Sequence, residues 1–212
     1  MNSASGAFTK TAISVTSLSV SKRERFICQV ASAEISAGQT VGITGENGSG
    51  KSTFLRVLAG LEKDFQGKCE IDIAVADRVF VHQSPYLFSG SVLDNVEYGL
   101  KAKRLSKPER RSQARHWLDQ LGIAHLATRS VKSLSGGEAR RTALARACVL
   151  QPRLLLLDEP LADLDPQGIE YVMHSLKTLP DSTILISSPS PLPAELVQAS
   201  ISLDNRAAKN NG

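Results

Sequence analysis

The chain has 212 residues and a formal net charge of +4, and 42% of its residues are hydrophobic and 22% charged. These values are ordinary for a globular protein and suit one α/β domain with a substantial core. The sequence has no apolar run of the roughly 18 residues needed to cross a bilayer. Its three cysteines lack the paired spacing of zinc or redox sites. We therefore expect a cytosolic globular protein with reduced thiols.

The first part of the chain is predicted to form strands around one loop and helix. Residues 1–10 are expected to be a flexible tail. Ile13–Val20 and Phe26–Ala33 carry β-branched residues in alternation, which predicts two antiparallel strands. Thr40–Ile43 is predicted to be a buried strand that leads through a loop into a helix ending near Gly60.

The rest of the chain alternates short strands with helices. Further strands are predicted at Ile71–Ile73, Val79–Val81, Arg153–Glu159, Ile184–Ser188 and Ile201–Leu203. Helices are predicted at Val92–Leu100, Pro108–Leu121, Gly136–Leu150 and Pro166–Leu176, with Ser91 and Ser106 as N-caps of the first two. Residues 205–212 are expected to be a frayed polar end.

The loop after the third strand carries the most informative motif. It consists of Gly45, Glu46, Asn47, Gly48, Ser49, Gly50, Lys51, Ser52 and Thr53, and it fits the phosphate-binding pattern G-x-x-x-x-G-K-[ST]. Small residues let successive backbone N–H groups surround a polyphosphate, and the helix N-terminus favours an anion. Lys51 is expected to reach the β- and γ-phosphates, and the Ser52 hydroxyl to ligate Mg²⁺.

Four later segments complete a constellation with this loop. They are Gln83 at the end of a strand, Leu134–Glu138 (LSGGE), Leu154–Pro160 (LLLLDEP) and Leu164–Asp165. Together the five segments resemble the nucleotide-binding subunit of ATP-binding cassette (ABC) transporters over about residues 13–204. LSGGE is the specific element, because other P-loop nucleotidases lack it.

The resemblance implies an α/β fold, a P-loop NTPase ABC cassette with a RecA-like core, an antiparallel β subdomain and an inserted helical subdomain. A single ABC ATPase domain would span residues 11–204, between the two tails. Its core would comprise 11–83 and 150–204, and its helical subdomain about 84–149. The implied cofactors are ATP and Mg²⁺.

The resemblance also implies roles at the ATP site. Asp158, at the end of the buried strand, would hold Mg²⁺ with Ser52 and Gln83. Glu159 matches the family's general base, which polarises the attacking water and typically contributes about 10²–10⁴ in rate. Gln83 matches a switch glutamine that touches both the metal and the water, and Lys51 completes the catalytic set.

The implied active unit is a head-to-tail dimer with two ATP molecules at its interface. Ser135, Gly136 and Gly137 would bind the γ-phosphate held by the opposite subunit, from a helix N-terminus. Asp165 matches the aspartate of the segment that crosses the interface. The partner would be a second nucleotide-binding subunit, identical or different.

These features predict an ATP-binding and hydrolysing subunit that powers a membrane transporter. His82–Leu100 resembles bacterial importers of small oxyanions, particularly tungstate and molybdate. The chain would need a separate transmembrane permease, an importer would need an extracytoplasmic solute-binding protein, and the chain would lie peripherally at the cytoplasmic face of the cell (inner) membrane. Tyr86, Leu87 and Phe88 either contact the permease or pack within the helical subdomain.

Other interpretations remain. Genome-maintenance relatives carry long coiled coils or zinc modules, which this sequence lacks, and translation-factor relatives carry two cassettes, so no nucleic-acid partner is expected. A nucleotide-gated module that does not hydrolyse ATP is a further alternative. Residues 101–115 carry seven basic residues against one acid, which indicates either a solvated helix face or a surface for anionic headgroups.

The sequence departs from the family at two places. Pro189 occupies the position of a histidine that contacts the γ-phosphate, and proline offers neither a side-chain donor nor a backbone N–H. The stretch Ser21–Arg25 lacks the aromatic residue that stacks on adenine, which an Arg or Lys could replace. The chain is therefore either the weakened half of a heterodimer or a slow homodimer in which Ser188 or Ser190 substitutes.

The Pro189 departure gives a first prediction. We expect Pro189→His to raise steady-state phosphate release, because one preorganised transition-state donor is commonly worth about 10²–10³ in rate. Unchanged turnover in this variant would count against the missing histidine as the cause of slow hydrolysis.

Overall fold

The chain folds around two β-sheets, and the computed structural model describes residues 10–23, 25–179 and 181–203. The predicted tails at 1–10 and 205–212 lie outside these residues, except for Lys10. An antiparallel sheet has the order β2-β1-β4 and consists of β1 (Thr11–Lys22), β2 (Arg25–Ser36) and β4 (Gln66–Ile71). A parallel sheet has the order β5-β6-β7-β3-β8 and consists of β3 (Thr40–Thr44), β5 (Arg78–Val81), β6 (Leu154–Leu157), β7 (Thr183–Ser188) and β8 (Ala199–Ser202).

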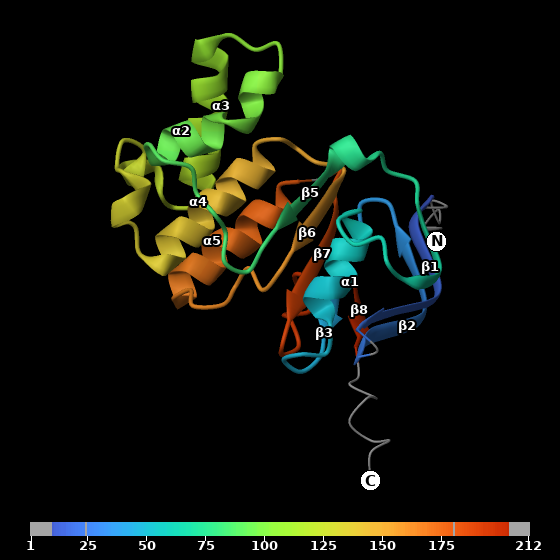
Figure 1. Cartoon of the computed structure of the whole chain (residues 1–212). Coiled ribbons are helices and arrows are strands. Elements are labelled where there is room, and N and C mark those ends of the chain that lie inside the picture. Colours follow the sequence, from blue (N-terminus) through green and yellow to red (C-terminus); the bar gives the residue numbers. More distant parts are fainter. Residues whose placement is uncertain (1–9, 24, 180, 204–212) are drawn as a thin grey trace, which may run out of the picture.

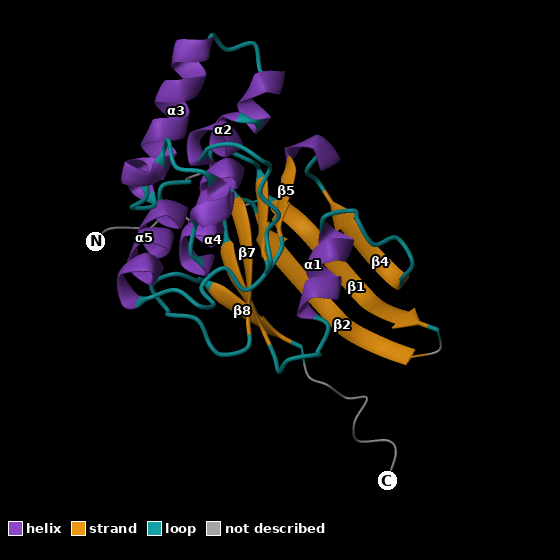
Figure 2. Ribbon diagram, turned by 60° about the vertical axis from the view of Figure 1, so that its left-hand side comes forward, coloured by secondary structure: helices purple, strands orange, loops and turns teal. Residues whose placement is uncertain are grey.

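Helices cover both faces of the parallel sheet. The helices are α1 (Lys51–Leu58), α2 (Val92–Glu97), α3 (Lys107–Gln120), α4 (Gly136–Cys148) and α5 (Pro166–Lys177). Figure 2 shows α1 between the two sheets and the other four helices on the opposite side of the parallel sheet. This arrangement confirms the predicted α/β class with an antiparallel sheet and a helical layer.

The strand β6 explains why one sheet can carry two hydrophobic cores. Leu155 and Leu157 belong to the core beneath the helical layer, whereas Leu154 and Leu156 belong to the core that α1 and the antiparallel sheet share. All four side chains are fully buried. Successive strand residues point to opposite faces, so an unbroken leucine run is what a strand buried on both faces requires.

Two predicted elements are displaced. The strand expected at Ile71–Ile73 is instead β4, which ends at Ile71, because its pairing with β1 begins at Gln66 opposite Ser19. Pairing with a long neighbouring strand overrides the weak strand preference of this polar segment. The α-helix expected to reach Leu100 ends at Glu97 and continues as a 3₁₀ turn at Gly99–Ala102.

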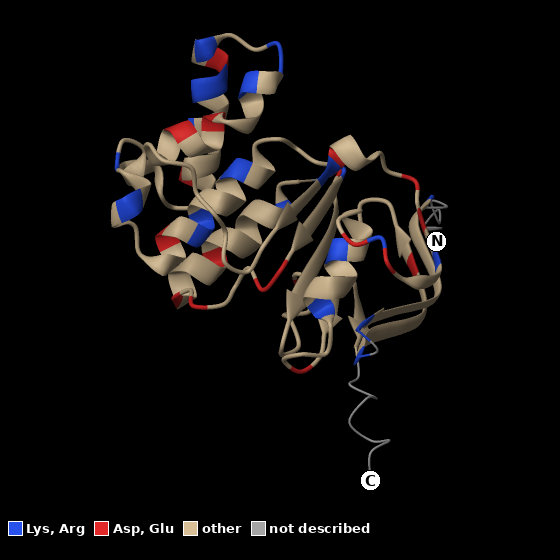
Figure 3. Cartoon of the chain, viewed as in Figure 1, with Lys and Arg blue, Asp and Glu red and all other residues tan. Residues whose placement is uncertain are grey.

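The basic run at residues 101–115 forms an exposed tip above α2. Figure 3 shows lysines and arginines gathered there. Part of this charge is used within the chain, because Arg111 pairs with Glu97 at 3.2 Å and Lys103 donates to the carbonyl of Leu150 at 3.0 Å. The exposed positions agree with the interpretation of the run as a solvated face.

The central position of β6 gives a stability prediction. We expect Leu156→Ala to lower the free energy of unfolding by about 2–5 kcal/mol, because it leaves a cavity in a close-packed core. Leu61→Ala is the matched control, since Leu61 is 59% exposed, and it should change stability by less than about 0.5 kcal/mol. Urea unfolding measures both. Equal losses in the two variants would contradict this account of the core.

Candidate nucleotide site

The loop Gly45–Gly50 joins β3 to α1 in a conformation that only glycine supports at its ends. Gly45 and Gly50 have φ values of 149° and 90°. A Cβ atom on Gly45 would lie 2.5 Å from the carbonyl oxygen of Leu203, and one on Gly50 would lie 2.4 Å from Cys28 Cβ. The loop is therefore clamped at Gly45 against the residue that follows β8 and at Gly50 against the antiparallel sheet, with no room for a larger residue at these two positions.

The loop offers hydrogen-bond donors that the protein does not use. Within the described ranges, the backbone N–H groups of Gly48, Gly50, Lys51 and Ser52 donate to no protein acceptor. The Ser49 hydroxyl is buried and has no partner among the described residues. Buried polar groups are normally satisfied, so this set of donors at a helix N-terminus fits the oxygens of a bound polyphosphate.

Lys51 lies at the start of α1 and is buried. Its Nζ donates to the carbonyls of Gly45 at 2.8 Å and Glu46 at 3.1 Å. The same atom lies 3.7 Å from Glu159 Oε1. The ammonium group is thus held at the mouth of the loop, between the expected phosphate position and the acidic pair.

Asp158 follows β6 directly and is buried, as predicted for a metal-binding carboxylate. Its Oδ1 accepts hydrogen bonds from the Ser52 hydroxyl at 3.0 Å and from the Ser187 hydroxyl at 2.8 Å. The structure therefore brings together the two residues expected to hold Mg²⁺. Sequence reasoning missed Ser187, although a hydroxyl closing the apolar strand beside LLLLDEP was a signal.

Glu159 is held through both its side chain and its backbone. Gln83 Nε2 donates to Glu159 Oε2 at 2.9 Å, and the Glu159 N–H donates to the Ser187 hydroxyl at 2.9 Å. The φ of Glu159 is 47°, a left-handed value that is uncommon outside glycine. The expected base and the expected switch glutamine are thus in direct contact.

The oxygen donors at this site suit Mg²⁺ better than a transition metal. Ser52 and Asp158 supply a hydroxyl and a carboxylate. The Gln83 amide uses its nitrogen in the bond to Glu159, which leaves its oxygen available to bind a metal ion. Among the described residues there is no cluster of three His, Cys, Asp or Glu side chains that could hold a metal ion. Mg²⁺ usually binds through one or two carboxylates together with substrate phosphates, and these residues fit that pattern.

The segment Ser135–Gly137 lies apart from the phosphate loop of its own chain. Ser135 caps α4, since its hydroxyl accepts from the Glu138 N–H at 3.3 Å while its own N–H donates to Glu138 Oε2 at 2.7 Å. This N–H lowers the pKa of Glu138. A Cβ atom on Gly137 would lie 3.3 Å from Leu164 Cδ2. In the part of the chain that the structure describes, no hydrogen bond or ion pair joins this segment to residues 45–53.

Asp165 has a structural role that the sequence did not reveal. Its carboxylate accepts from the Gly168 N–H at 2.8 Å and caps α5. A second unpredicted contact joins the helical layer to the core, because Arg140 Nη2 in α4 donates to the carbonyl of Gln83 at 3.1 Å. The same guanidinium lies 3.5 Å from Asp163 Oδ2.

Fold and site together define a P-loop nucleotide-binding cassette, and comparison with known proteins identifies the family. Residues 28–162 match the family described as ABC transporter. The chain is 37% identical over 165 residues to the tungstate uptake system ATP-binding protein TupC of Peptoclostridium acidaminophilum, covering 76% of this chain and 77% of that protein. It is 46% identical over 153 residues to the aliphatic sulfonates import ATP-binding protein SsuB of Mycobacterium avium (strain 104), covering 72% of this chain and 59% of that protein. The chain belongs to the ABC transporter family.

A solved structure supports the same assignment. The chain matches the dimeric post-hydrolysis state of an ATP-binding cassette bound to ADP and Pi with a TM-score of 0.79 and 27% identity, covering 90% of this chain and 94% of that one. Across residues 10–23, 25–179 and 181–203, no helix has the length and apolar character that a bilayer crossing needs.

The clamped loop gives a prediction about its glycines. Gly50→Ala should lower stability by about 1–3 kcal/mol through overpacking against Cys28 and weaken ATP binding at least about tenfold, because the loop must move. Gly48→Ala is the matched control. Gly48 also has a positive φ, of 85°, but an added Cβ atom would have no neighbour within 4 Å, so only local strain of about 1–2 kcal/mol is added. Thermal unfolding and ATP titration measure both. Equal effects on ATP binding would contradict the clamp.

Proposed function

We propose that this chain binds ATP with Mg²⁺ and hydrolyses it to power a membrane transporter, as the ATP-binding subunit of a bacterial importer of a small solute such as an oxyanion. The observation that carries the proposal is the network in which Ser52, Asp158, Glu159 and Gln83 meet beside the phosphate loop. The printed functions of the tungstate and sulfonate relatives support the solute class.

Each residue at this site has a proposed part in hydrolysis. The free N–H groups of Gly48, Gly50, Lys51 and Ser52 bind the phosphates, and the Lys51 ammonium adds a positive charge there. The other residues of the loop from Gly45 to Thr53 complete the proposed binding site. Bound Mg²⁺, held by Ser52, Asp158 and Gln83, supplies charge neutralisation at the phosphates.

Glu159 is the proposed general base. Its carboxylate already accepts a hydrogen bond from Gln83, an arrangement that fixes where it can take a proton from water. Gln83 orients that carboxylate and links it to Arg140 through its own carbonyl. A conformational change in the helical layer would therefore reach the base directly.

We further propose one cassette domain over residues 11–204, with its core at 11–83 and 150–204 and its helical subdomain at about 84–149. Among the described residues no hydrogen bond or ion pair joins Ser135, Gly136 and Gly137 to their own phosphate loop, which supports their use on the ATP held by a second cassette. Asp165 stands at the start of α5 beside them in the proposed dimer interface. The dimeric solved relative supports this assembly.

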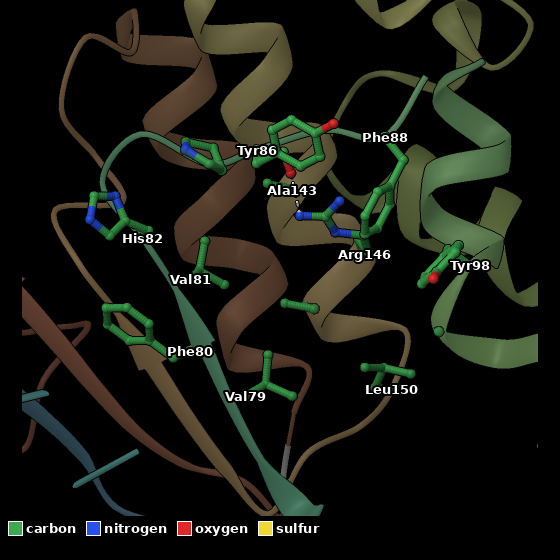
Figure 4. Close-up of a pocket in the computed structure, with 13 residues that line it drawn as sticks. Val79, Phe80, Val81, His82, Tyr86, Phe88, Tyr98, Ala143, Arg146 and Leu150 are labelled. Carbon is green, nitrogen blue, oxygen red and sulfur yellow. Dashed lines mark hydrogen bonds between the residues drawn. The ribbon is translucent and has the colours of Figure 1, made fainter. Parts of the chain in front are cut away.

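A groove beside α4 is the proposed docking place of the permease. Figure 4 shows Tyr86, Phe88, Tyr98 and Arg146 along it, with Val79 and Leu150 below them in the view. Tyr86 and Tyr98 are 73% and 52% exposed, and the Arg146 guanidinium lies 5.0 Å from the centre of the Phe88 ring. Exposure of these rings supports a contact role, whereas Leu87 packs against the helical core.

The proposed docking on a permease also implies where the chain is located in the cell. A chain that docks on a permease through this groove would lie peripherally at the cytoplasmic face of the cell (inner) membrane. An importer would also use an extracytoplasmic solute-binding protein to deliver the solute to the permease. The basic tip at residues 101–115 would then lie on the same helical layer as the docking groove.

A second candidate function follows from Pro189, which is exposed just after β7. With no side-chain donor there, the chain could serve as the weakened half of a heterodimer, or as a nucleotide-gated module. The Ser188 hydroxyl accepts from the Ser190 N–H at 3.2 Å and keeps its own proton, so it is the proposed substitute donor.

Steady-state phosphate release with Mg-ATP, measured beside a Glu159→Gln variant, decides between these functions. We expect the wild-type chain to release phosphate, and the variant to lose at least about 10²-fold in rate while still binding ATP. Equal release by both proteins would contradict Glu159 as the base. Binding without release by either would favour the weakened half.

A further inference from the structure

Ser187 occupies the junction between the strand that leads to the phosphate loop and the strand that leads to the carboxylates. In the parallel sheet β7 lies between β6 and β3. Ser187 is opposite Ile43 of β3, and its predecessor Ile186 is opposite Leu157 of β6. The β6–β7 backbone ladder ends at that pair, so Ser187 lies next to Asp158 at the point where the acidic pair begins.

The Ser187 hydroxyl continues the connection where the backbone ladder stops. It donates to Asp158 Oδ1 at 2.8 Å and accepts from the Glu159 N–H at 2.9 Å. The residue is only 1% exposed, so water cannot easily replace either bond. One hydroxyl therefore contacts both functional residues of the LLLLDEP segment, using its proton for one and a lone pair for the other.

Glu159 depends on this contact because its backbone is in a costly conformation. A left-handed φ costs a non-glycine residue about 1–2 kcal/mol, and such strain persists only where surrounding contacts hold it. The φ of Glu159 is 47°. Its N–H bond to Ser187 holds one side of this turn, and the Ala162 N–H bond to the Glu159 carbonyl at 3.3 Å holds the other. Loss of the hydroxyl would therefore loosen the backbone of the base.

Asp158 depends on the same hydroxyl in a different way. Its Oδ1 accepts from Ser187 on one side and from Ser52 on the other. Two hydroxyl donors on one oxygen fix the plane of the carboxylate relative to α1. With Ser187 removed, Ser52 would be the one remaining donor to this carboxylate among residues 10–23, 25–179 and 181–203, and Ser52 is itself one of the proposed metal ligands.

We propose that Ser187 is a positioning residue of the ATP site, whose hydroxyl sets the orientation of Asp158 for the metal and of Glu159 for the water. This inference rests on the proposed function, since it assumes that these two carboxylates do the chemistry. Ser187 touches neither nucleotide nor metal in this role. It acts through the two residues that do.

The test uses two variants of the full chain that differ only in the hydroxyl. Ser187→Thr keeps the hydroxyl and Ser187→Val replaces it with a methyl group of the same shape, and both β-branched residues suit a strand. The added methyl group is common to both variants, so any packing effect cancels in the comparison. Glu159→Gln is included as the control for the proposed base.

The first measurement is phosphate release as a function of ATP concentration. We expect kcat of Ser187→Val to fall about 10- to 100-fold below that of Ser187→Thr, with KM of the two variants within about threefold. A lower kcat at constant KM and an unchanged melting temperature indicates misplaced groups in the transition state. A merely destabilised protein would also lose apparent kcat, through a smaller active fraction, but it would melt at a lower temperature.

The second measurement does not depend on turnover. The Mg²⁺ concentration that gives half of the ATP-induced thermal stabilisation should rise about tenfold in Ser187→Val and stay within about twofold of wild type in Ser187→Thr. ATP binding without Mg²⁺ should be equal in the two variants. This measurement decides the proposal even if the isolated chain hydrolyses ATP too slowly to follow.

The outcomes separate this inference from the proposed function. Equal kcat and equal Mg²⁺ dependence in the Thr and Val variants would overturn the role of Ser187, even if the Val variant melts at a lower temperature. Undiminished hydrolysis by Glu159→Gln would instead overturn the proposed base, and the Mg²⁺ dependence would still decide whether Ser187 orients Asp158.

Discussion

The buried carboxylate of Asp158 is the point on which the rest of the site depends. Its Oδ1 accepts from Ser52 at the start of α1 and from Ser187 at the end of β7, while its own backbone follows β6. One residue therefore joins a helix and two strands, two of them through Oδ1 and the third through its backbone. A buried carboxylate without such partners would be costly, so the same bonds that satisfy it also set the geometry of the phosphate loop relative to the acidic pair.

Local sequence patterns predict much of this architecture. The leucine run of β6 predicted a strand buried on both faces, and the serines before α2 and α3 predicted helix starts that the structure confirms with capping boxes. The glycines of the phosphate loop predicted a backbone whose N–H groups turn inward, and Gly45 and Gly50 have φ values that few other residue types tolerate. These features depend on near neighbours in the chain, which is why sequence reasoning reaches them.

Other features depend on contacts between distant segments, and the sequence did not reveal them. β4 starts at Gln66 because β1 offers a partner there, not because Gln66 and Gly67 favour a strand. Ser187 reaches Asp158 and Glu159 because β7 lies between β3 and β6 in the sheet, and this strand order cannot be read from the local sequence. Arg140 could not be distinguished by pattern from the other charged residues of α4, although it bonds to the carbonyl of Gln83.

The contact between Gly50 and Cys28 gives the antiparallel sheet a chemical consequence. The loop covers this cysteine, and burial raises the pKa of the Cys28 thiol to about 11. At neutral pH only about one thiol in ten thousand is then the reactive thiolate. The cysteine packed beneath the phosphate loop is thus a poor nucleophile while it stays buried, and oxidation or alkylation of it would first require local opening of this part of the core.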